Sequence, residues 1–449
     1  PITKWSERVN RASGMEDAVH RAVRLATGDR PGAVHLSLPS DVLEDGGGEN
    51  RRLGRAATLG SVPSSRPRAD AGEVLRAAEL LARAERAVIV AGGGVLTSGA
   101  WDQLTAFAEA TGIPVGTSIN GKGAIAETSD CSIGVVGNNG ARTYANAWIA
   151  EADLVFYIGS RTDWTTTVAW TLPERDNPPA SIHLDISAKE IGNNYPSSAI
   201  LQGDAGATLE DLLAAMEHPE RIRARNAERL ARLSSERATY FDQVRRDAAS
   251  DSQPIKPQRL IAVLRELLDD DAIVVADPGT PTPYLSAQYE VRHARRTTVI
   301  PRAYGALGYA IPGVVGAHFA GQGRRVVGML GDGSYGMSVG ELETISRLDL
   351  PVVIVQCDNG TYGWIKELQH LYHHKRYYSV DFNRIDYAAI AQGFGIAGFH
   401  VEDPAELKGV LRHALESGRP AFVNVVTEAQ MTETPPVATW ERTVAASLR

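Results

Sequence analysis

Two polar turns follow two apolar runs in the C-terminal third of this 449-residue chain. The first turn is Gly331-Asp332-Gly333, and the second is Asp358-Asn359-Gly360. If the two runs are neighbouring parallel strands, both turns lie at the same edge of the sheet, and Asp332 and Asn359 present oxygen atoms to one point. Mg²⁺ prefers oxygen ligands of this kind, together with phosphate oxygens and a backbone carbonyl. The pattern predicts a site for a divalent cation and a diphosphate group.

A strand–helix–strand unit is expected to position these turns. Apolar runs of strand length occupy Val326–Leu330 and Val352–Gln356, and Ser338–Leu348 between them has helical spacing. Gly331 and Gly333 permit a close approach of the backbone to a phosphate, and the N-terminus of the following helix favours negative charge. An ordinary turn with a capping aspartate is the alternative. The second turn, with its own flanking strand, favours the cation and diphosphate site.

The composition sets broad limits on the class of protein. Hydrophobic residues make up 43% of the chain and charged residues 22%, as in ordinary globular proteins. The net charge is −8, without a basic block, so no nucleic-acid partner is expected. No apolar run approaches the ~20 residues that a membrane helix needs, and the first residues lack a signal-peptide core. Cys131 and Cys357 lie far apart and indicate neither a disulfide framework nor zinc. We expect a cytoplasmic protein without a membrane partner.

Alternating strand and helix patterns predict an α/β protein built from parallel-sheet domains. Residues 278–284 (PGTPTPY) read as a turn, and the glycine-rich turn in AGGGVLTSGA (91–100) is by itself weak evidence for a nucleotide. The expected divisions are a helix and strand at 1–45, a linker at 46–75, an α/β unit at 76–217, a charged connecting helix at 218–258, a further α/β unit at 259–430 and a tail of little periodicity at 431–449.

The two turns resemble the thiamine diphosphate (ThDP) motif, in which GDG is followed after 25 residues by Asn. Here 25 residues separate Gly333 from Asn359. The order of GDRPGAVHLSLPSDV, AGGGVLTSGA, INGKGAIAE, IGSRTD and RAYGALGYAIPGVVGA makes nearly all of 1–430 similar to the acetolactate synthase-like branch of ThDP enzymes. That branch includes acetolactate synthase, pyruvate oxidase, benzoylformate decarboxylase and the 2-hydroxyacyl-CoA lyases. The resemblance implies a C-terminal remnant of a pyrimidine-binding domain at 1–45, a central nucleotide-binding-like domain at 76–217 and a pyrophosphate- and Mg²⁺-binding domain at 259–430.

The resemblance also assigns roles to individual residues. It makes Asp332 and Asn359 side-chain ligands of Mg²⁺ and gives the backbone carbonyl of Thr361 as a third ligand. Leu307 falls where the family has a bulky apolar residue that holds the cofactor in its bent, V-shaped form. The residues expected to contact the cofactor are Gly279, Thr280, Thr282, Gly305, Leu307, Gly331, Asp332, Gly333, Ser334, Asn359, Thr361, Tyr362, Gly363 and Trp364.

One catalytic residue of the family has no counterpart here. The activating glutamate, which hydrogen-bonds the aminopyrimidine ring, belongs to the front of the pyrimidine-binding domain, and Glu7, Glu16 and Glu44 lie in the wrong part of it. Two explanations stay open. A naturally split enzyme, whose small subunit carries the glutamate, is our first expectation, and a sequence that begins late is the second. Family sites lie between subunits, so a homo- or hetero-oligomer is expected, with a dimer of dimers preferred.

The reaction implied is the making or breaking of a C–C bond next to the carbonyl of a 2-oxo acid. A 2-hydroxyacyl-CoA lyase and a non-catalytic ThDP-binding subunit are the alternatives. Leu368 stands where acetolactate synthases usually carry a tryptophan, which argues against a strict branched-chain synthase. FAD, ADP or CoA is a further expectation for the central domain. Arg161 and Asp185 would hold it there, or they pair with each other or with their neighbours.

Three histidines follow the second turn in HLYHHKRYY. His370, His373 and His374 have a spacing that permits a proton shuttle or a transition-metal pair. A solvated, basic helix end is the simpler interpretation, and we prefer it. A nucleotide-binding dehydrogenase is disfavoured because no GxGxxG with a trailing acidic residue is present.

Overall fold

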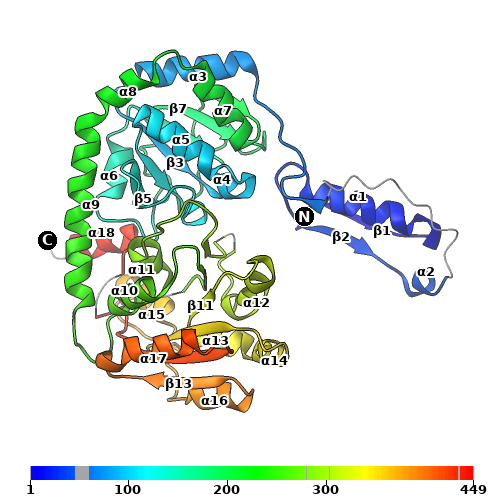
Figure 1. Ribbon diagram of the computed structural model, residues 1–449, viewed down its shortest axis with the longest axis vertical. Coiled ribbons are helices and arrows are strands. Elements are labelled where there is room, and N and C mark those ends of the chain that lie inside the picture. The colour runs from blue at the N-terminus through cyan, green and yellow to red at the C-terminus, as the bar shows by residue number, and fades with distance from the viewer. Residues whose placement is uncertain (1, 46–59, 280, 303, 433–434, 448–449) are drawn as a thin grey trace.

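Two parallel sheets, one above the other in Figure 1, form the body of the chain. The computed structural model describes residues 2–45, 60–279, 281–302, 304–432 and 435–447. Each sheet has six strands, and the long helix α9 (Ala227–Ala248) runs along one side of the first sheet unit toward the second. A small N-terminal lobe stands to the other side. The predicted α/β class with parallel sheets is confirmed.

The first sheet has the strand order β5–β4–β3–β6–β7–β8, with every neighbouring pair parallel. Its central strands are buried apolar runs because helices cover both faces. The strands are β3 (Ala87–Ala91), β4 (Val115–Thr117), β5 (Ser132–Val135), β6 (Leu154–Ile158), β7 (Ala180–Asp185) and β8 (Ala199–Gln202). The helices are α3 (Ala71–Arg83), α4 (Gly93–Ser98), α5 (Trp101–Thr111), the 3₁₀ turn η3 (Ile119–Gly121), α6 (Ala145–Ala150), α7 (Ala205–Ala215) and α8 (Pro219–Arg225).

The second sheet has the order β10–β9–β11–β12–β14–β13 and is also parallel throughout. Its strands are β9 (Ile273–Ala276), β10 (Thr298–Val299), β11 (Val326–Gly331), β12 (Val352–Asp358), β13 (Ala397–Val401) and β14 (Ala421–Val426). Its helices are α10 (Pro257–Leu267), α11 (Pro281–Gln288), α12 (Ala310–Ala320), α13 (Asp332–Ser338), the 3₁₀ turn η4 (Val339–Glu341), α14 (Leu342–Arg347), α15 (Gly363–Tyr372), α16 (Tyr387–Gly393), α17 (Pro404–Glu416) and α18 (Ala438–Ser447).

The N-terminal lobe contains one short parallel strand pair with helices beside it. Its elements are β1 (Trp5–Arg8), the 3₁₀ turn η1 (Ala12–Gly14), α1 (Met15–Thr27), β2 (Val34–Ser37) and α2 (Ser40–Glu44). An ion pair between Arg30 and Glu190 joins the lobe to the first sheet unit. Residues 46–59 of the predicted linker lie outside the described residues. Its last residues differ from the prediction because Asp70 accepts hydrogen bonds from the N–H groups of Gly72 and Glu73 and so starts α3 at Ala71.

Two segments that lack a helical pattern in the sequence are helices. Residues 278–284 were predicted to be a turn, but α11 begins at Pro281, a residue type that suits the first helical position. The tail at 431–449, which shows little periodicity in the sequence, contains α18. The Trp440 ring of α18 packs 4.4 Å from the Trp364 ring of α15, measured between centroids. Packing on α15, rather than local periodicity, accounts for this helix.

Two further sequence expectations concern cysteines and membranes. Cys131 and Cys357 are buried and free, so they behave as small core residues. Among the described helices, none is both long enough and apolar enough to cross a lipid bilayer.

Candidate functional site

Three neighbouring strands of the second sheet end at the predicted site. In β11 and β12, Gly331 pairs with Cys357, so Asp332 and Asp358 follow side by side at the same edge. Strand β9 pairs with the other side of β11, and the N–H of Asp277 donates to the carbonyl oxygen of Met329. The loops after these three strands contain most of the predicted site residues. The register of the sheet therefore gathers segments that are up to about 80 positions apart in the sequence.

The Asp332 carboxylate connects the two turns at this edge of the sheet. Asp332 is 5% exposed, and its Oδ1 accepts a hydrogen bond of 2.8 Å from the N–H of Gly333. Its Oδ2 accepts from the N–H groups of Asn359 at 3.2 Å and Gly360 at 2.7 Å. One side chain at the end of β11 thus fixes the turn after β12. The turns Gly331-Asp332-Gly333 and Asp358-Asn359-Gly360, which we expected at the same edge of the sheet, are in contact.

The electrostatic environment of Asp332 favours a cation. Burial raises the pKa of Asp332 to about 7, the negative charge of Asp358 adds to this, and the backbone N–H groups oppose it. Asp358 is itself held by Asn424, whose Nδ2 donates to Asp358 Oδ2 at 2.9 Å. Two carboxyl groups at one sheet edge repel each other, and a bound cation would relieve that repulsion.

Asn359 and Thr361 complete a set of oxygen donors. Asn359 Oδ1 accepts a 3.3 Å hydrogen bond from the N–H of Thr361, and Thr361 Oγ1 donates to the Val380 carbonyl at 2.6 Å. The Thr361 carbonyl accepts from the N–H of Gly363 at 2.8 Å, across a tight turn centred on Tyr362. Carboxylate, amide and carbonyl oxygens are the donors that suit Mg²⁺. The described residues contain no group of three or more His, Cys, Asp and Glu side chains that would hold a metal ion on their own.

Gly333 lies directly against the Tyr362 ring. A Cβ added to Gly333 would lie 2.4 Å from Tyr362 Cε1 and 3.3 Å from Phe382 Cζ. The Tyr362 and Phe382 rings are packed edge to face, with centroids 4.5 Å apart. No other residue fits at position 333 without moving the ring. The structure therefore brings Gly333, the buried Ser334 and Tyr362 together, as their assignment to one site requires.

The loop after β9 meets the segment that contains Leu307. A Cβ added to Gly279 would lie 3.7 Å from Leu307 Cδ2, an ordinary contact distance. Gly305 and Gly308 both have positive φ angles, which shape this segment before α12. A Cβ on Gly308 would meet Met337 Cβ of α13 at 3.0 Å, so the segment also touches the helix that Asp332 begins. Thr280 lies outside the described residues, and its assignment stays a prediction.

Asp277 organises this part of the site, and the sequence did not single it out. Its fully buried carboxylate accepts from the N–H of Tyr309 at 2.9 Å through Oδ1 and from the N–H of Ala310 at 3.2 Å through Oδ2. It thereby caps α12 from a distance, and the Thr282 hydroxyl donates to the Asp277 carbonyl. A polar residue at the end of the apolar run AIVVA was the one signal available.

The side chains along α15 have different surroundings. The Trp364 ring packs on Trp440, as described above, whereas Ile365 is 47% exposed. His370 Nδ1 lies 2.7 Å from the Tyr377 hydroxyl, and the two rings are stacked. The contact with Tyr377 accounts for the position of the His370 ring without a proton shuttle or a metal pair.

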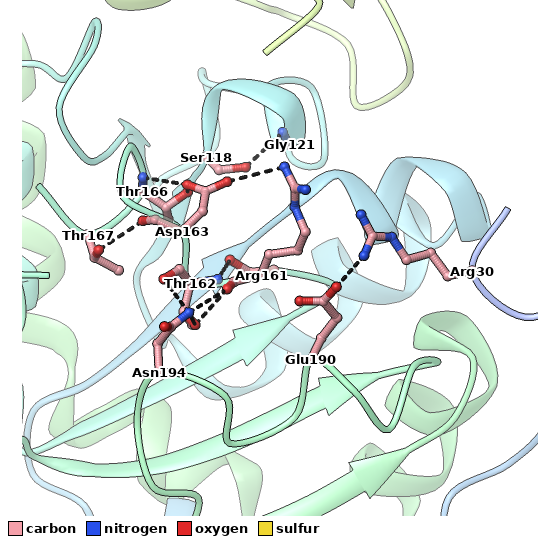
Figure 2. Close-up of polar contacts among 11 residues, drawn as sticks. Arg30, Ser118, Gly121, Arg161, Thr162, Asp163, Thr166, Thr167, Glu190 and Asn194 are labelled. Carbon is pink, nitrogen blue, oxygen red and sulfur yellow. Dashed lines mark hydrogen bonds and ion pairs between the residues drawn. The ribbon is translucent and has the colours of Figure 1, made fainter. Parts of the chain in front are cut away.

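A second concave site lies at the corresponding edge of the first sheet, and Figure 2 shows part of it. The cavity measures about 720 Å³. Its walls come from both sheet units and from the N-terminal lobe, and they include Arg30, Gly92, Gly93, Gly94, Ser118, Asn120, Gly159, Arg161, Asp163, Asp185, Glu190, Asp204, Arg296 and Thr298. A Cβ on Gly92 would meet the Gly159 carbonyl oxygen at 2.2 Å, so close packing of two strand ends requires this glycine. A cavity of this size and position suits a nucleotide-sized ligand.

Arg161 and Asp185 do not pair with each other within this cavity. Arg161 forms an ion pair with its neighbour Asp163 at 3.4 Å, as the second of the two expectations allowed (Figure 2). Asp185 Oδ1 accepts from the N–H of Ser187 at 2.8 Å, and burial raises the pKa of Asp185 to about 6. Both side chains line the cavity and keep polar atoms for a ligand.

His183 contacts Ser160 of the cavity wall. It is 2% exposed, and its Nε2 lies 2.9 Å from the carbonyl oxygen of Ser160, while its Nδ1 lies 3.4 Å from the N–H of Gly192. These contacts fit a neutral ring that donates from Nε2 and accepts at Nδ1. Burial lowers the pKa of His183 to about 4.

Comparison with known proteins places both sites in matched segments. A family model described as thiamine pyrophosphate enzyme, central domain, matches residues 74–212. A second, described as thiamine pyrophosphate enzyme, C-terminal TPP binding domain, matches residues 277–425. The first segment contains most of the polar wall of the cavity, and the second contains Asp277, Leu307, Asp332, Asn359 and Thr361.

Named relatives align over almost the whole chain. A probable acetolactate synthase large subunit of Methanocaldococcus jannaschii is 32% identical over 441 residues, which span 95% of this chain and 72% of the relative. The acetolactate synthase large subunit of Parasynechococcus marenigrum is 29% identical over 95% of this chain and 67% of its own length. The isozyme 3 large subunit of Escherichia coli acetolactate synthase is 28% identical, over 95% and 74% respectively.

The neutral state of His183 predicts a defined pH dependence of stability. Its pKa of about 4 in the folded protein lies below the unfolded value of about 6.5, so the unfolded chain binds more protons between these pH values. The free energy of unfolding should therefore fall as the pH falls from 6.5 to 4, with up to about 3 kcal/mol due to His183. Urea denaturation across this range should show a shallower fall for His183→Gln. The exposed His218→Gln is the control, and equal slopes for His183→Gln and wild type would contradict the assignment.

Proposed function

The chain belongs to the thiamine pyrophosphate enzyme family, and on that basis we propose that it is a ThDP- and Mg²⁺-dependent carboligase of the acetolactate synthase type. Its proposed substrates are 2-oxo acids, next to whose carbonyl a C–C bond is made or broken. The observation that carries the proposal is the cluster of Asp332, Asn359 and Thr361 at adjoining strand ends, within the segment that matches the TPP-binding domain.

In this proposal Mg²⁺ is held by oxygen atoms alone. Asp332 supplies a carboxylate, Asn359 its side-chain amide oxygen and Thr361 its backbone carbonyl, and the diphosphate would supply the remaining ligands. The donor set fits a hard cation, and burial, which raises the pKa of Asp332, makes a counter-charge beside this carboxylate favourable. A divalent cation between protein and diphosphate would supply that counter-charge.

The cofactor would lie along the three loops at this edge. Gly279, Thr282, Gly331, Gly333 and Ser334 are proposed to contact the diphosphate, where absent side chains permit a close backbone approach. The remaining residues are proposed to surround the rings of the cofactor: Gly305, Leu307, Tyr362, Gly363 and Trp364.

ThDP supplies, when bound, a nucleophilic carbon that attacks a carbonyl group. The chain's own residues bind and orient. Asp332 fixes the second turn and would hold the metal, Asp277 holds the start of α12 and with it the Leu307 segment, and the Tyr362 ring packs against Gly333. Because orientation contributes much of the rate in such reactions, these positioning contacts are part of the proposed function.

A second chain is part of the proposal. Several relatives carry the words large subunit in their names, which supports a smaller partner for this chain as well. The same names favour a synthase-type reaction on 2-oxo acids over a 2-hydroxyacyl-CoA lyase.

We further propose that the cavity of the first sheet unit holds a nucleotide. The proposed ligand is FAD, or else ADP or CoA, which have an ADP moiety in common with FAD. The cavity lies at the carboxyl ends of parallel strands beside the glycines at 92–94, where phosphates bind in sheets of this type. Arg161 offers a charge for a phosphate, and Asp185 offers an acceptor for a ribose hydroxyl.

The metal site can be tested by removing its central carboxylate. Titration calorimetry with ThDP in excess Mg²⁺ should show binding to wild type and at least about 100-fold weaker binding to Asp332→Ala, because a charged ligand is lost. Asp332→Asn keeps the shape of the side chain but only one of its two acceptor oxygens, and it should show a similar loss. The surface variant Glu343→Ala, in α14 of the same unit, is the control. Undiminished affinity in folded Asp332→Asn and Asp332→Ala would rule out this site.

The proposed role of Leu307 can be tested by measuring cofactor binding and turnover separately. In the complex purified from its host cells through a tag on this chain, wild type should form acetolactate from pyruvate. Leu307→Ala should bind ThDP with little change but lower kcat by about 10- to 100-fold, because a misplaced reacting group loses orientation. Turnover of Leu307→Ala equal to wild type would contradict its assignment. A wild-type complex that binds ThDP but converts no 2-oxo acid would contradict the carboligase.

Nucleotide binding in the cavity of the first sheet unit can be tested separately from the metal site. ADP and FAD should each be titrated into wild type, and the purified protein examined for flavin absorbance. Arg161→Ala and Asp185→Asn should weaken binding by about tenfold or more, since the first removes a charged donor and the second replaces a carboxylate acceptor with a neutral amide. Arg175→Ala, on an exposed segment, should bind as wild type does. No binding of either nucleotide to wild type would rule out this proposal.

A further inference from the structure

Three charged side chains form a buried cluster outside both sites. Lys122 is fully buried, and Glu127 and Arg142 are each 1% exposed. Lys122 Nζ lies 2.7 Å from Glu127 Oε1, and Arg142 Nη2 lies 3.1 Å from Glu127 Oε2. One carboxylate is thus shared by two cations. Burial lowers the pKa of Lys122 to about 8, an effect that Glu127 opposes and Arg142 reinforces.

The two cations also bind the end of a helix in the other sheet unit. Lys122 Nζ donates to the Ser286 carbonyl at 3.0 Å, and Arg142 Nε donates to the Ala287 carbonyl at 3.1 Å. Both carbonyls lie in the last turn of α11, which ends at Gln288. Positive charge at a helix C-terminus is favourable, and these donors satisfy carbonyl groups that lack partners within the helix.

The carboxylate of the cluster secures the segment just after α11. Glu127 Oε2 accepts from the N–H of Val291 at 2.9 Å, and the N–H of Glu127 donates to the Val291 carbonyl at 2.7 Å. α11 is also packed tightly against the first sheet unit, because a Cβ on Gly140 would meet Ser286 Cβ at 2.3 Å. The C-terminal end of α11 is therefore fixed to the first unit by side-chain and backbone contacts.

The N-terminal end of α11 belongs to the proposed ThDP site. The helix begins at Pro281, two residues after Gly279, and Thr282 in its first turn donates to the Asp277 carbonyl. An eight-residue helix is about 12 Å long and nearly rigid, so a shift at one end is transmitted to the other. The described side chains of α11 are almost all buried, which leaves it little freedom to adjust on its own.

Simple stabilisation does not account for this cluster. A buried ion pair recovers its desolvation cost only with good geometry, and apolar residues of similar size often serve stability equally well. Apolar side chains, however, cannot donate to the Ser286 and Ala287 carbonyls. What the charges add is a fixed position for the end of α11.

We propose that Lys122, Glu127 and Arg142 are positioning residues for the ThDP site, which fix α11 from its C-terminal end and thereby place Gly279 and Thr282. This inference rests on the proposed function, because it assumes that the loop before α11 contacts the cofactor. It adds to that function a contribution from the central unit, whose residues lie far from the metal ligands in the sequence.

The test uses the full chain and two readouts. Glu127→Gln keeps the shape of the side chain but leaves two buried cations without their counter-charge, and Lys122→Met removes one charge at similar volume. Both should raise amide hydrogen exchange in 281–288 by about tenfold or more without ThDP, while exchange in 358–363 stays unchanged. Both should weaken ThDP binding in Mg²⁺ by about 10- to 100-fold, as the loss of supporting contacts does at other cofactor sites. Glu266→Gln, in the exposed pair with Lys408, is the control.

Lys122→Met keeps the test decisive if Glu127→Gln does not fold, since it leaves no uncompensated buried charge. Exchange in 281–288 and ThDP affinity both unchanged in folded Lys122→Met would overturn the inference. Faster exchange in 281–288 with unchanged affinity would also overturn it, because the cluster would then hold α11 without serving the site. Wild type that does not bind ThDP would instead overturn the proposed function.

Discussion

The structure depends most on a single carboxylate that joins two strand ends. Asp332 begins α13 at the end of β11, and its oxygens accept N–H groups from its own turn and from the turn after β12. The parallel register of β11 and β12 makes this possible, because it places the residues after Gly331 and Cys357 side by side. A buried acid with only backbone donors stays poorly compensated, so the arrangement that orders the turns also supports the proposal of a cation site there.

The other parts of the site are positioned relative to this edge by contacts between distant segments. Asp277 fixes the start of α12 and hence the Leu307 segment, and Thr282 ties α11 to the same strand end. The first sheet unit then holds the far end of α11 through Lys122 and Arg142. In our proposal the ThDP site is thus supported by both units, although the proposed metal ligands all come from one.

Motifs with a fixed local geometry were predictable from the sequence. Gly331-Asp332-Gly333 and Asp358-Asn359-Gly360 directly follow apolar runs, and a parallel sheet leaves such turns one place to lie. Asp277 could not be found in this way, because its partners Tyr309 and Ala310 are more than 30 positions away. The same holds for Lys122, Glu127 and Arg142, since charged residues in a sequence read as surface until a fold buries them. α11 and α18 were missed because prolines and tertiary packing, rather than periodicity, define them.

The central claim is that Asp332, Asn359 and Thr361 together hold the metal of a bound diphosphate cofactor. The most direct test is diffraction from crystals of the full chain grown with ThDP and Mn²⁺ in place of Mg²⁺, with an anomalous difference map to locate the metal. The account predicts one strong peak within about 2.0–2.3 Å of Asp332 Oδ, Asn359 Oδ1 and the Thr361 carbonyl oxygen, bridged to diphosphate density. A cofactor-bound metal peak that none of these three oxygens contacts would contradict it.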